Sequence, residues 1–308
     1  MYPFTIAILL VGVALFFDYC NGVHDSSNIV ATMISSRAIS PIWALIIASL
    51  FEFTGAYFLG TAVAQTIGKG IVNPEIIKVV PNGIIIVFAA LIAAISWNLF
   101  TWYFGIPTSS SHALIGGLLG AFVVSRGFSI VNWNRVAGIF LVLVASPIVG
   151  LVLGFLFTKI VYFFSQWSSP SANILFKKLQ VGASILLALS HGTNDAQKTM
   201  GVITFSLVVL GLYQPPSGTL PIPRWVVVAC AGAIASGILN GGWRIIKTLG
   251  VKLYKIRAIH GFTAQSSSAI IIYGAALFGF PVSTTQIVTS TIMGAGSAEK
   301  PKAVRWEV

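Results

Sequence analysis

The sequence predicts an all-α protein that crosses a membrane several times. Hydrophobic residues make up 56% of its 308 residues and charged residues only 8%, whereas a soluble domain has about 25% charged residues. Two runs without Asp, Glu, Lys or Arg, 79–125 and 258–298, are each long enough for about two crossings at roughly 20 residues per helix. This composition leaves little chain for a soluble domain.

The first half of the chain contains five hydrophobic segments, and we expect each of them to be helical. They cover residues 1–36, 41–68, 83–104, 106–126 and 134–165. The first segment has no basic n-region and no small-residue cleavage site before Asp18, so we interpret it as a membrane helix and not as a signal peptide. Cys20 and Cys230 predict neither a disulfide framework nor a metal cluster.

The net charge of +11 does not indicate nucleic-acid binding, because the basic residues lie between hydrophobic runs. One such loop, 244–257, has five basic residues and no acid: Arg244, Lys247, Lys252, Lys255 and Arg257. This bias is typical of cytoplasmic loops. We therefore place 244–257 in the cytoplasm of a protein of the inner or plasma membrane.

The chain contains an internal repeat, which three matches in the same order indicate. They pair 21–25 with 191–195 at an offset of 170 residues, 105–112 with 279–286 at an offset of 174, and Trp133 with Trp306 at an offset of 173. In the first repeat, the counterpart of the basic loop is the region 69–82, whose charged residues Lys69, Glu75 and Lys78 give a net charge of only +1. Opposite sides of the membrane would explain this difference.

Each repeat would cross the membrane an odd number of times, so the second copy would be inverted. We expect a first inverted repeat at 1–165 and a second at 166–308, with broken or re-entrant helices that meet at the midplane. This architecture is frequent among secondary transporters. The second copy lacks a counterpart to the last helix of the first, and we expect that the sequence is truncated there.

Four of the seven acidic residues lie in or beside hydrophobic segments: Asp18, Asp25, Glu52 and Asp195. An ionised side chain at mid-membrane costs about 2.5–3.5 kcal/mol on insertion scales, so such residues usually mark a binding site or an ion pathway. Gly22 and Gly192 predict that the helix breaks beside Asp25 and Asp195. These aspartates, with Asn21 and Asn194, offer oxygen ligands for Na⁺ or an acceptor for a proton.

The second repeated motif predicts an anion site. Pro107 and Pro281 suit the first turn of a helix. The hydroxyl groups that follow are those of Thr108, Ser109, Ser110 and Ser111, and of Ser283, Thr284 and Thr285. Two helix N-termini that converge with such donors bind anions. Carboxylates nearby favour phosphate, which keeps a proton at neutral pH, over sulfate, which has none to donate.

The motifs at 21–28 (Asn-Gly-x-His-Asp-x-x-Asn) and 191–198 (His-Gly-Thr-Asn-Asp-Ala-Gln-Lys) resemble the two signature motifs of the inorganic phosphate transporter (PiT) family. Those at 107–112 and 281–286 resemble its paired hydroxyl motifs. The resemblance implies symport of phosphate with Na⁺ or H⁺ and no other cofactor, in a homodimer surrounded by lipid. It assigns cation binding to Asn21, Asp25, Asn194 and Asp195, and phosphate binding to the hydroxyl runs.

The sequence departs from this family pattern at His24, at Gln197-Lys198 and at Gln286, and Lys198 could replace a coupling cation with a fixed charge. Side chains expected to support the site are His24, Asn28, Glu52, His112, His191, Lys198 and Gln286. The alternatives are a sulfate permease of the same superfamily, a passive anion channel and an intramembrane hydrolase. The absence of a Gly-x-Ser-x-Gly motif argues against an enzyme.

Overall fold

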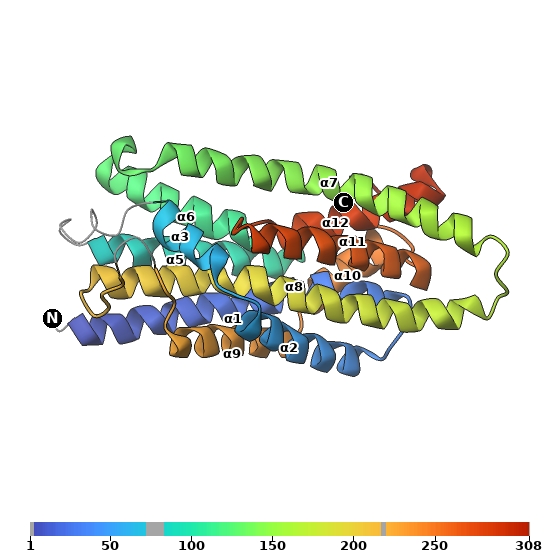
Figure 1. The fold of residues 1–308 in the computed structure, drawn as a ribbon, viewed down its shortest axis with the longest axis horizontal. Coiled ribbons are helices and arrows are strands. Elements are labelled where there is room, and N and C mark those ends of the chain that lie inside the picture. The colour runs from blue at the N-terminus through green and yellow to red at the C-terminus, as the bar shows by residue number, and fades with distance from the viewer. Residues whose placement is uncertain (1–2, 72–82, 217–219, 308) are drawn as a thin grey trace.

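The computed structural model describes residues 3–71, 83–216 and 220–307, and within these ranges it contains helices but no strand. In chain order the helices are α1 (Pro3–Ser35), α2 (Pro41–Phe58), α3 (Ala62–Gly70), α5 (Gly83–Phe104), α6 (Ser110–Arg126), η1 (Phe128–Ile130), α7 (Trp133–Ser165), α8 (Ala172–Val209), α9 (Arg224–Asn240), α10 (Trp243–Lys247), η2 (Thr248–Lys252), α11 (Ala258–Leu277), α12 (Thr284–Glu299) and η3 (Pro301–Ala303). The long helices lie along one common axis (Figure 1).

The distribution of side chains is that of a multi-pass membrane protein. In the part of the chain that the structure describes, five helices, α1, α2, α5, α7 and α8, are long and apolar enough to span a membrane. The pair formed by α9 and the α10–η2 segment, bent by 59°, would be a sixth span. Large apolar side chains point outward, such as Leu141, which is 72% exposed, whereas Asp25 and Asp195 are 0% exposed. A bilayer favours this arrangement because its apolar interior solvates the outer side chains.

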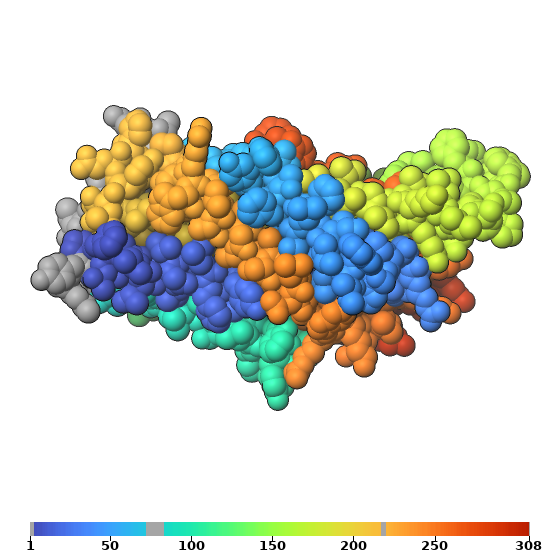
Figure 2. All heavy atoms as spheres, turned by 90° about the horizontal axis from the view of Figure 1, so that it is seen from below, coloured from blue at the N-terminus to red at the C-terminus, as the bar shows by residue number. Residues whose placement is uncertain are grey.

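Helices of the first half of the chain pack against helices of the second half. α1 packs against α9, and α8 packs against α2; Figure 2 shows α9 beside α1 and α2 on one face of the molecule. The prediction that the helix breaks at Gly22 and at Gly192 is wrong, since α1 and α8 run continuously through them. These glycines instead permit close packing: an added Cβ would lie 2.1 Å from the Ile234 carbonyl oxygen at Gly22, and 2.2 Å from that of Glu52 at Gly192.

The chain does break before the second pair of motifs. Gly105 and Gly279 end α5 and α11 with φ values of +68° and +72°, a conformation that glycine adopts at little cost. Both have Schellman-type bonds, in which the amide of the residue after the glycine donates to the carbonyl five residues earlier, that of Thr101 in one case and of Ala275 in the other, each at 2.9 Å. The chain therefore reverses within the bundle.

The next helices begin later than predicted. Ser109 is the N-cap of α6 and Ser283 is the N-cap of α12, and their hydroxyl oxygens accept from the third amide that follows, at 3.2 and 3.3 Å. Pro107 and Pro281 therefore precede the N-caps by two residues and do not lie in the first turns. A side-chain cap makes the better start because it satisfies an amide that would otherwise lack a partner.

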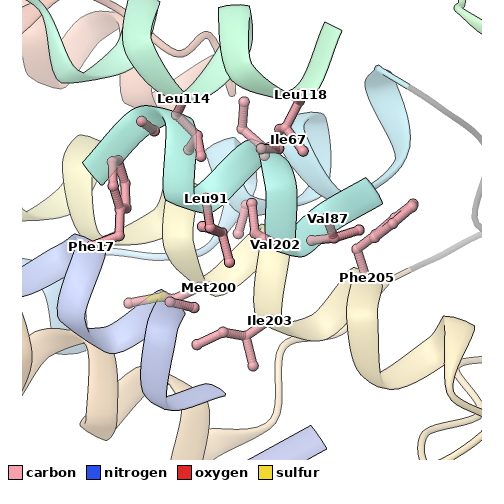
Figure 3. Packing of buried hydrophobic residues seen from close by; sticks show 14 of the residues in the cluster. Phe17, Ile67, Val87, Leu91, Leu114, Leu118, Met200, Val202, Ile203 and Phe205 are labelled. Carbon is pink, nitrogen blue, oxygen red and sulfur yellow. The ribbon is translucent and has the colours of Figure 1, made fainter. Parts of the chain in front are cut away.

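An apolar cluster fixes α5 and α6 over α1 and α8 (Figure 3). Phe17 of α1, Leu91 of α5, Leu114 of α6 and Met200 of α8 are each at most 1% exposed and belong to it. Close packing of this kind makes the start of α6 a rigid part of the bundle. This packing therefore holds the start of α6 in place relative to α1 and α8.

The matched tryptophans make matching contacts. Each indole N–H donates to the carbonyl five residues earlier, Trp133 to Phe128 at 2.9 Å and Trp306 to Pro301 at 3.3 Å. In each case that carbonyl belongs to the first residue of a short 3₁₀ helix, η1 or η3. Such paired contacts support an internal repeat, whereas its division at 165/166 and its inversion stay predictions.

The basic region 244–257 is largely helical and not the simple loop that we predicted, because α10 and η2 fill its first part. Its basic side chains are exposed. Arg244 lies over the ring of Tyr103 with its guanidinium carbon 4.7 Å from the ring centroid. Of the compared region 69–82, Glu75 and Lys78 lie outside the described residues.

Candidate functional site

Asp25 of α1 is buried at the point where α6 and α12 begin. One carboxylate oxygen accepts a hydrogen bond from Ser110 of α6 at 3.1 Å, and the other accepts from Thr285 of α12 at 2.9 Å. His24 approaches the same carboxylate with its Nδ1 at 3.2 Å. The two hydroxyl runs, which are far apart in the sequence, thus converge on a single aspartate.

Asp195 of α8 has an arrangement that is related but not identical. Thr284 of α12 donates to one of its oxygens at 3.3 Å. The other oxygen accepts from the ammonium group of Lys198 at 2.6 Å, and this ammonium also donates to Ser111 of α6 at 2.5 Å. Lys198 is 2% exposed, so its charge is held inside the bundle by a carboxylate of the opposite sign.

His191 lies between the two aspartates. Its Nε2 is 3.8 Å from Asp25 and 3.5 Å from Asp195, and its Nδ1 is 2.7 Å from Glu52 of α2. One ligand atom from each of Asp25, His191 and Asp195 can be chosen so that all three lie within 4.8 Å of one another. Two carboxylates and an imidazole at this spacing could hold a cation.

The asparagines of the two motifs differ in what they contact. Asn194 donates to the Phe280 carbonyl at 3.1 Å and its side-chain oxygen accepts from the Val282 amide at 3.3 Å, so it fixes the segment before α12. Its predicted role in cation binding stays a prediction. Asn28 donates to Thr285 at 3.0 Å. The side-chain oxygen of Asn21 is buried and has no hydrogen-bond partner among the described residues, which leaves it available as a ligand.

The predicted hydroxyl donors have different roles. Ser109 and Ser283 cap α6 and α12, as described above. Thr108 donates to Thr101 at 3.0 Å and lies 3.4 Å from Nε2 of His24, and Ser111 donates to the Val282 carbonyl at 2.7 Å. The hydroxyls that contact the aspartates directly are therefore those of Ser110, Thr284 and Thr285.

His112 and Gln286 do not join the carboxylate cluster. His112 is half-buried and Gln286 is exposed, and the bonds found for these residues in the described part of the chain use their main-chain amides at the two N-caps. No side-chain hydrogen bond from either residue to the aspartates is found in the described part of the chain, and the supporting role that we predicted for them stays a prediction.

Two polar contacts near the site were not predicted from the sequence, although Asp18 itself was among the four acids that we singled out. Asp18 of α1 is 0% exposed and accepts from Thr199 of α8 at 2.9 Å, while its other oxygen has no partner among the described residues. Thr101 of α5 lies 3.3 Å from Nε2 of His24. The signal for Asp18 was present in the sequence, since an acid within an apolar segment usually has a function; a single threonine in α5 gave no such signal.

Chemically, the site combines cation ligands with anion donors. The N-termini of α6 and α12 direct their positive ends at the two aspartates, and hydroxyl groups fill the space between. Buried carboxylates in a bundle of spanning helices, next to helix starts suited to an anion, are typical of a transport protein. The chain is thus a multi-span membrane transporter.

The chain belongs to the phosphate transporter family, whose model matches residues 21–308. It is 43% identical over 302 residues to a Bacillus subtilis protein and 44% identical over 304 residues to one from Rhizobium meliloti, each named "Probable low-affinity inorganic phosphate transporter"; both matches cover 98% of this chain and 89% of the relative. A solved structure titled "The sodium-dependent phosphate transporter" superimposes with a TM-score of 0.83 at 26% identity, covering 96% of this chain and 90% of that one. The predicted resemblance is confirmed.

Proposed function

We propose that this protein is a cation-coupled symporter that carries inorganic phosphate across the cytoplasmic membrane. The observation that carries the proposal is the convergence of Ser110, Thr284 and Thr285 on Asp25 and Asp195 in one buried site. Membership of the phosphate transporter family supports the choice of phosphate. The name of the similar solved structure supports Na⁺ as a coupling ion.

The hydrogen bonds of the site suggest how cation and phosphate are coupled. In this arrangement the hydroxyls of Ser110 and Thr285 donate to Asp25. A cation bound to that carboxylate would compete for its lone pairs and release the hydroxyls to donate to a phosphate oxygen. Since binding free energies are reciprocal, phosphate would then strengthen cation binding by the same factor.

Phosphate also has a donor of its own. At neutral pH it retains a proton, which it could donate to a carboxylate that has lost a hydroxyl partner. Sulfate offers no such proton and would leave that acceptor unsatisfied, at a cost of about 1–3 kcal/mol. This difference is the basis on which we favour phosphate over sulfate.

The test is uptake of radiolabelled phosphate by the full chain in liposomes, with Na⁺ and H⁺ gradients imposed separately. We expect gradient-dependent, saturable uptake that falls at least about tenfold in Asp25→Asn and Asp195→Asn, since one tenfold step corresponds to only about 1.4 kcal/mol. Glu307→Gln, an exposed acid far along the chain, is the control and should match the wild type. Undiminished uptake in both aspartate variants would contradict the assignment of the site. Competition by excess sulfate but not by excess phosphate would contradict the assignment of phosphate as the substrate.

We further propose that the protein is a homodimer in the inner or plasma membrane and that residues 244–257 face the cytoplasm. Exposed apolar side chains on α7, including Leu141 and Val144, provide surface for lipid. The exposed basic residues of 244–257 fit the charge bias of cytoplasmic segments. Crosslinking in native membranes would test the dimer, since a monomer alone would contradict it.

A further inference from the structure

Asn28 and Lys198 are corresponding residues of the two repeated motifs, because each follows the motif aspartate by three positions. In the first half, the Asn28 amide donates to Thr285 at 3.0 Å, and Thr285 donates to Asp25 at 2.9 Å. A neutral amide thus acts on the carboxylate through a hydroxyl. The basic groups that face the Asp25 carboxylate within the described residues are two imidazoles, His24 Nδ1 at 3.2 Å and His191 Nε2 at 3.8 Å, and no lysine or arginine contacts it there.

In the second half, an ammonium group takes the place of that relay. Ser111 corresponds to Thr285, but it donates to the Val282 carbonyl instead of to Asp195. The Lys198 nitrogen lies between them, 2.5 Å from Ser111 Oγ, 2.6 Å from Asp195 Oδ1 and 3.2 Å from the Val282 carbonyl oxygen. A carboxylate, a hydroxyl and a main-chain carbonyl form the kind of oxygen set that binds hard cations.

The buried oxygens without partners show the same asymmetry. In the first half, Asn21 Oδ1 and Asn28 Oδ1 have no hydrogen-bond partner among the described residues, and both side chains are at most 1% exposed. Their counterparts in the second half are His191 and Lys198, whose nitrogens contact Glu52 and Asp195. An unpartnered buried acceptor costs about 1–3 kcal/mol, so the first half has oxygens that a cation would satisfy.

We infer that the Lys198 ammonium is a tethered cation that fills the cation position of the second half, so that mobile coupling cation binds only in the first half, at Asp25 with Asn21 and Asn28. This inference rests on the proposed function, because it concerns how many cations accompany phosphate. A lysine suits this role because its ammonium group is a compact point charge on a flexible stem. Because the ammonium group is covalently attached, it cannot cross the membrane with the substrate. It therefore supplies a positive charge at the site but does not add to the number of cations transported with each phosphate.

The experiment measures apparent phosphate affinity of the full chain in liposomes, first over a Na⁺ series at fixed pH and then over a pH series at fixed Na⁺. The slopes of log affinity against log cation concentration report the cations taken up with phosphate. Lys198→Asn gives the second half the residue of the first, and we expect the sum of the two slopes to rise by about one. Lys178→Asn, an exposed lysine on the same helix α8, should leave the sum unchanged.

The reciprocal variant, Asn28→Lys, places a tethered cation in the first half and should lower the sum by about one. It decides the matter where Lys198→Asn does not elute as a single species in size-exclusion chromatography. A sum equal to that of the wild type in a folded, transporting Lys198→Asn, or in Asn28→Lys, would overturn the inference. Absence of phosphate uptake by the wild type would overturn the proposed function itself and is seen before any variant is compared.

Discussion

The close approach of α8 to α2 depends on Gly192, and replacing it with alanine gives a sharp prediction. The added Cβ would lie 2.2 Å from the carbonyl oxygen of Glu52 and 3.1 Å from the amide nitrogen of Ala56. Non-bonded heavy atoms prefer about 3.5–4.0 Å, so the two helices would have to separate by roughly 1 Å. Overpacking of this kind costs about 1–3 kcal/mol.

The same separation would disturb the site. His191 precedes Gly192, and its Nδ1 lies 2.7 Å from the side chain of the same Glu52 whose carbonyl would be displaced. We therefore expect Gly192→Ala to lose phosphate uptake as well as stability. Because each kcal/mol lowers the melting temperature of a protein of 150–250 residues by roughly 2–4 °C, the loss should be readily measured by thermal unfolding in detergent.

A matched control separates packing from helix propensity. Gly182 lies on the same helix, and an added Cβ there would meet nothing within 4 Å. Alanine in place of glycine in a helix is favourable by about 0.5–1 kcal/mol, so Gly182→Ala should melt at the same or a higher temperature and transport normally. If Gly192→Ala had the same melting temperature as Gly182→Ala and kept full phosphate uptake, close packing of α8 on α2 at Gly192 would be needed for neither stability nor transport.

Two further predictions concern buried polarity and topology. Thr199→Val removes the hydroxyl that donates to the buried Asp18 at 2.9 Å, and it should lower the free energy of unfolding by about 1–3 kcal/mol. Thr204→Val on the same helix is the control, because the Thr204 hydroxyl is buried and has no partner among the described residues. Equal melting temperatures of the two variants would contradict this prediction. Ser125→Cys, near the end of α6, and Lys300→Cys, just after α12, should react with an impermeant maleimide from opposite sides of the membrane if the repeats are inverted, with little background because Cys20 and Cys230 are buried. Labelling of both from one side would refute the inversion.

The predicted spans agree well with the helices because long apolar runs leave few alternatives. The segments 83–104 and 134–165 become α5 (Gly83–Phe104) and α7 (Trp133–Ser165). The segment 41–68 is divided, since α2 ends at Phe58 and α3 begins at Ala62, with Gly60 at a φ of +105° between them. Hydropathy alone does not reveal such a break, because the residues on both sides of it are apolar.

The error at Gly22 and Gly192 has a physical reason. A glycine beside polar residues in an apolar helix can serve a break in the backbone or a close helix contact, and the local sequence is the same in both cases. The deciding partners are Ile234 and Glu52, which lie far away in the chain. Both aspartates are buried, as their place in apolar segments led us to expect, and their role in binding stays a prediction. Their individual partners depend on tertiary packing, which the local sequence does not reveal.

The two halves of the site differ in their predicted cation ligands and not in their predicted anion donors. The corresponding hydroxyl pairs Ser110/Thr284 and Ser111/Thr285 exchange one hydroxyl for another, so both halves keep the same kind of anion donor. At the cation side, however, Asn21 and Asn28 are replaced by His191 and Lys198, which exchange neutral amides for side chains that can carry positive charge.

These replacements would alter the cation side while each donor position keeps a hydroxyl, although Lys198 also contacts the Ser111 hydroxyl at 2.5 Å. Both basic side chains lie against carboxylates, His191 at 2.7 Å from Glu52 and Lys198 at 2.6 Å from Asp195. A positive group supplied by the protein is always part of the molecule, whereas a bound cation stabilises a carboxylate only when it is present. On the proposed function, the number of coupling cations would therefore be set by two positions of α8, and the substrate by the starts of α6 and α12.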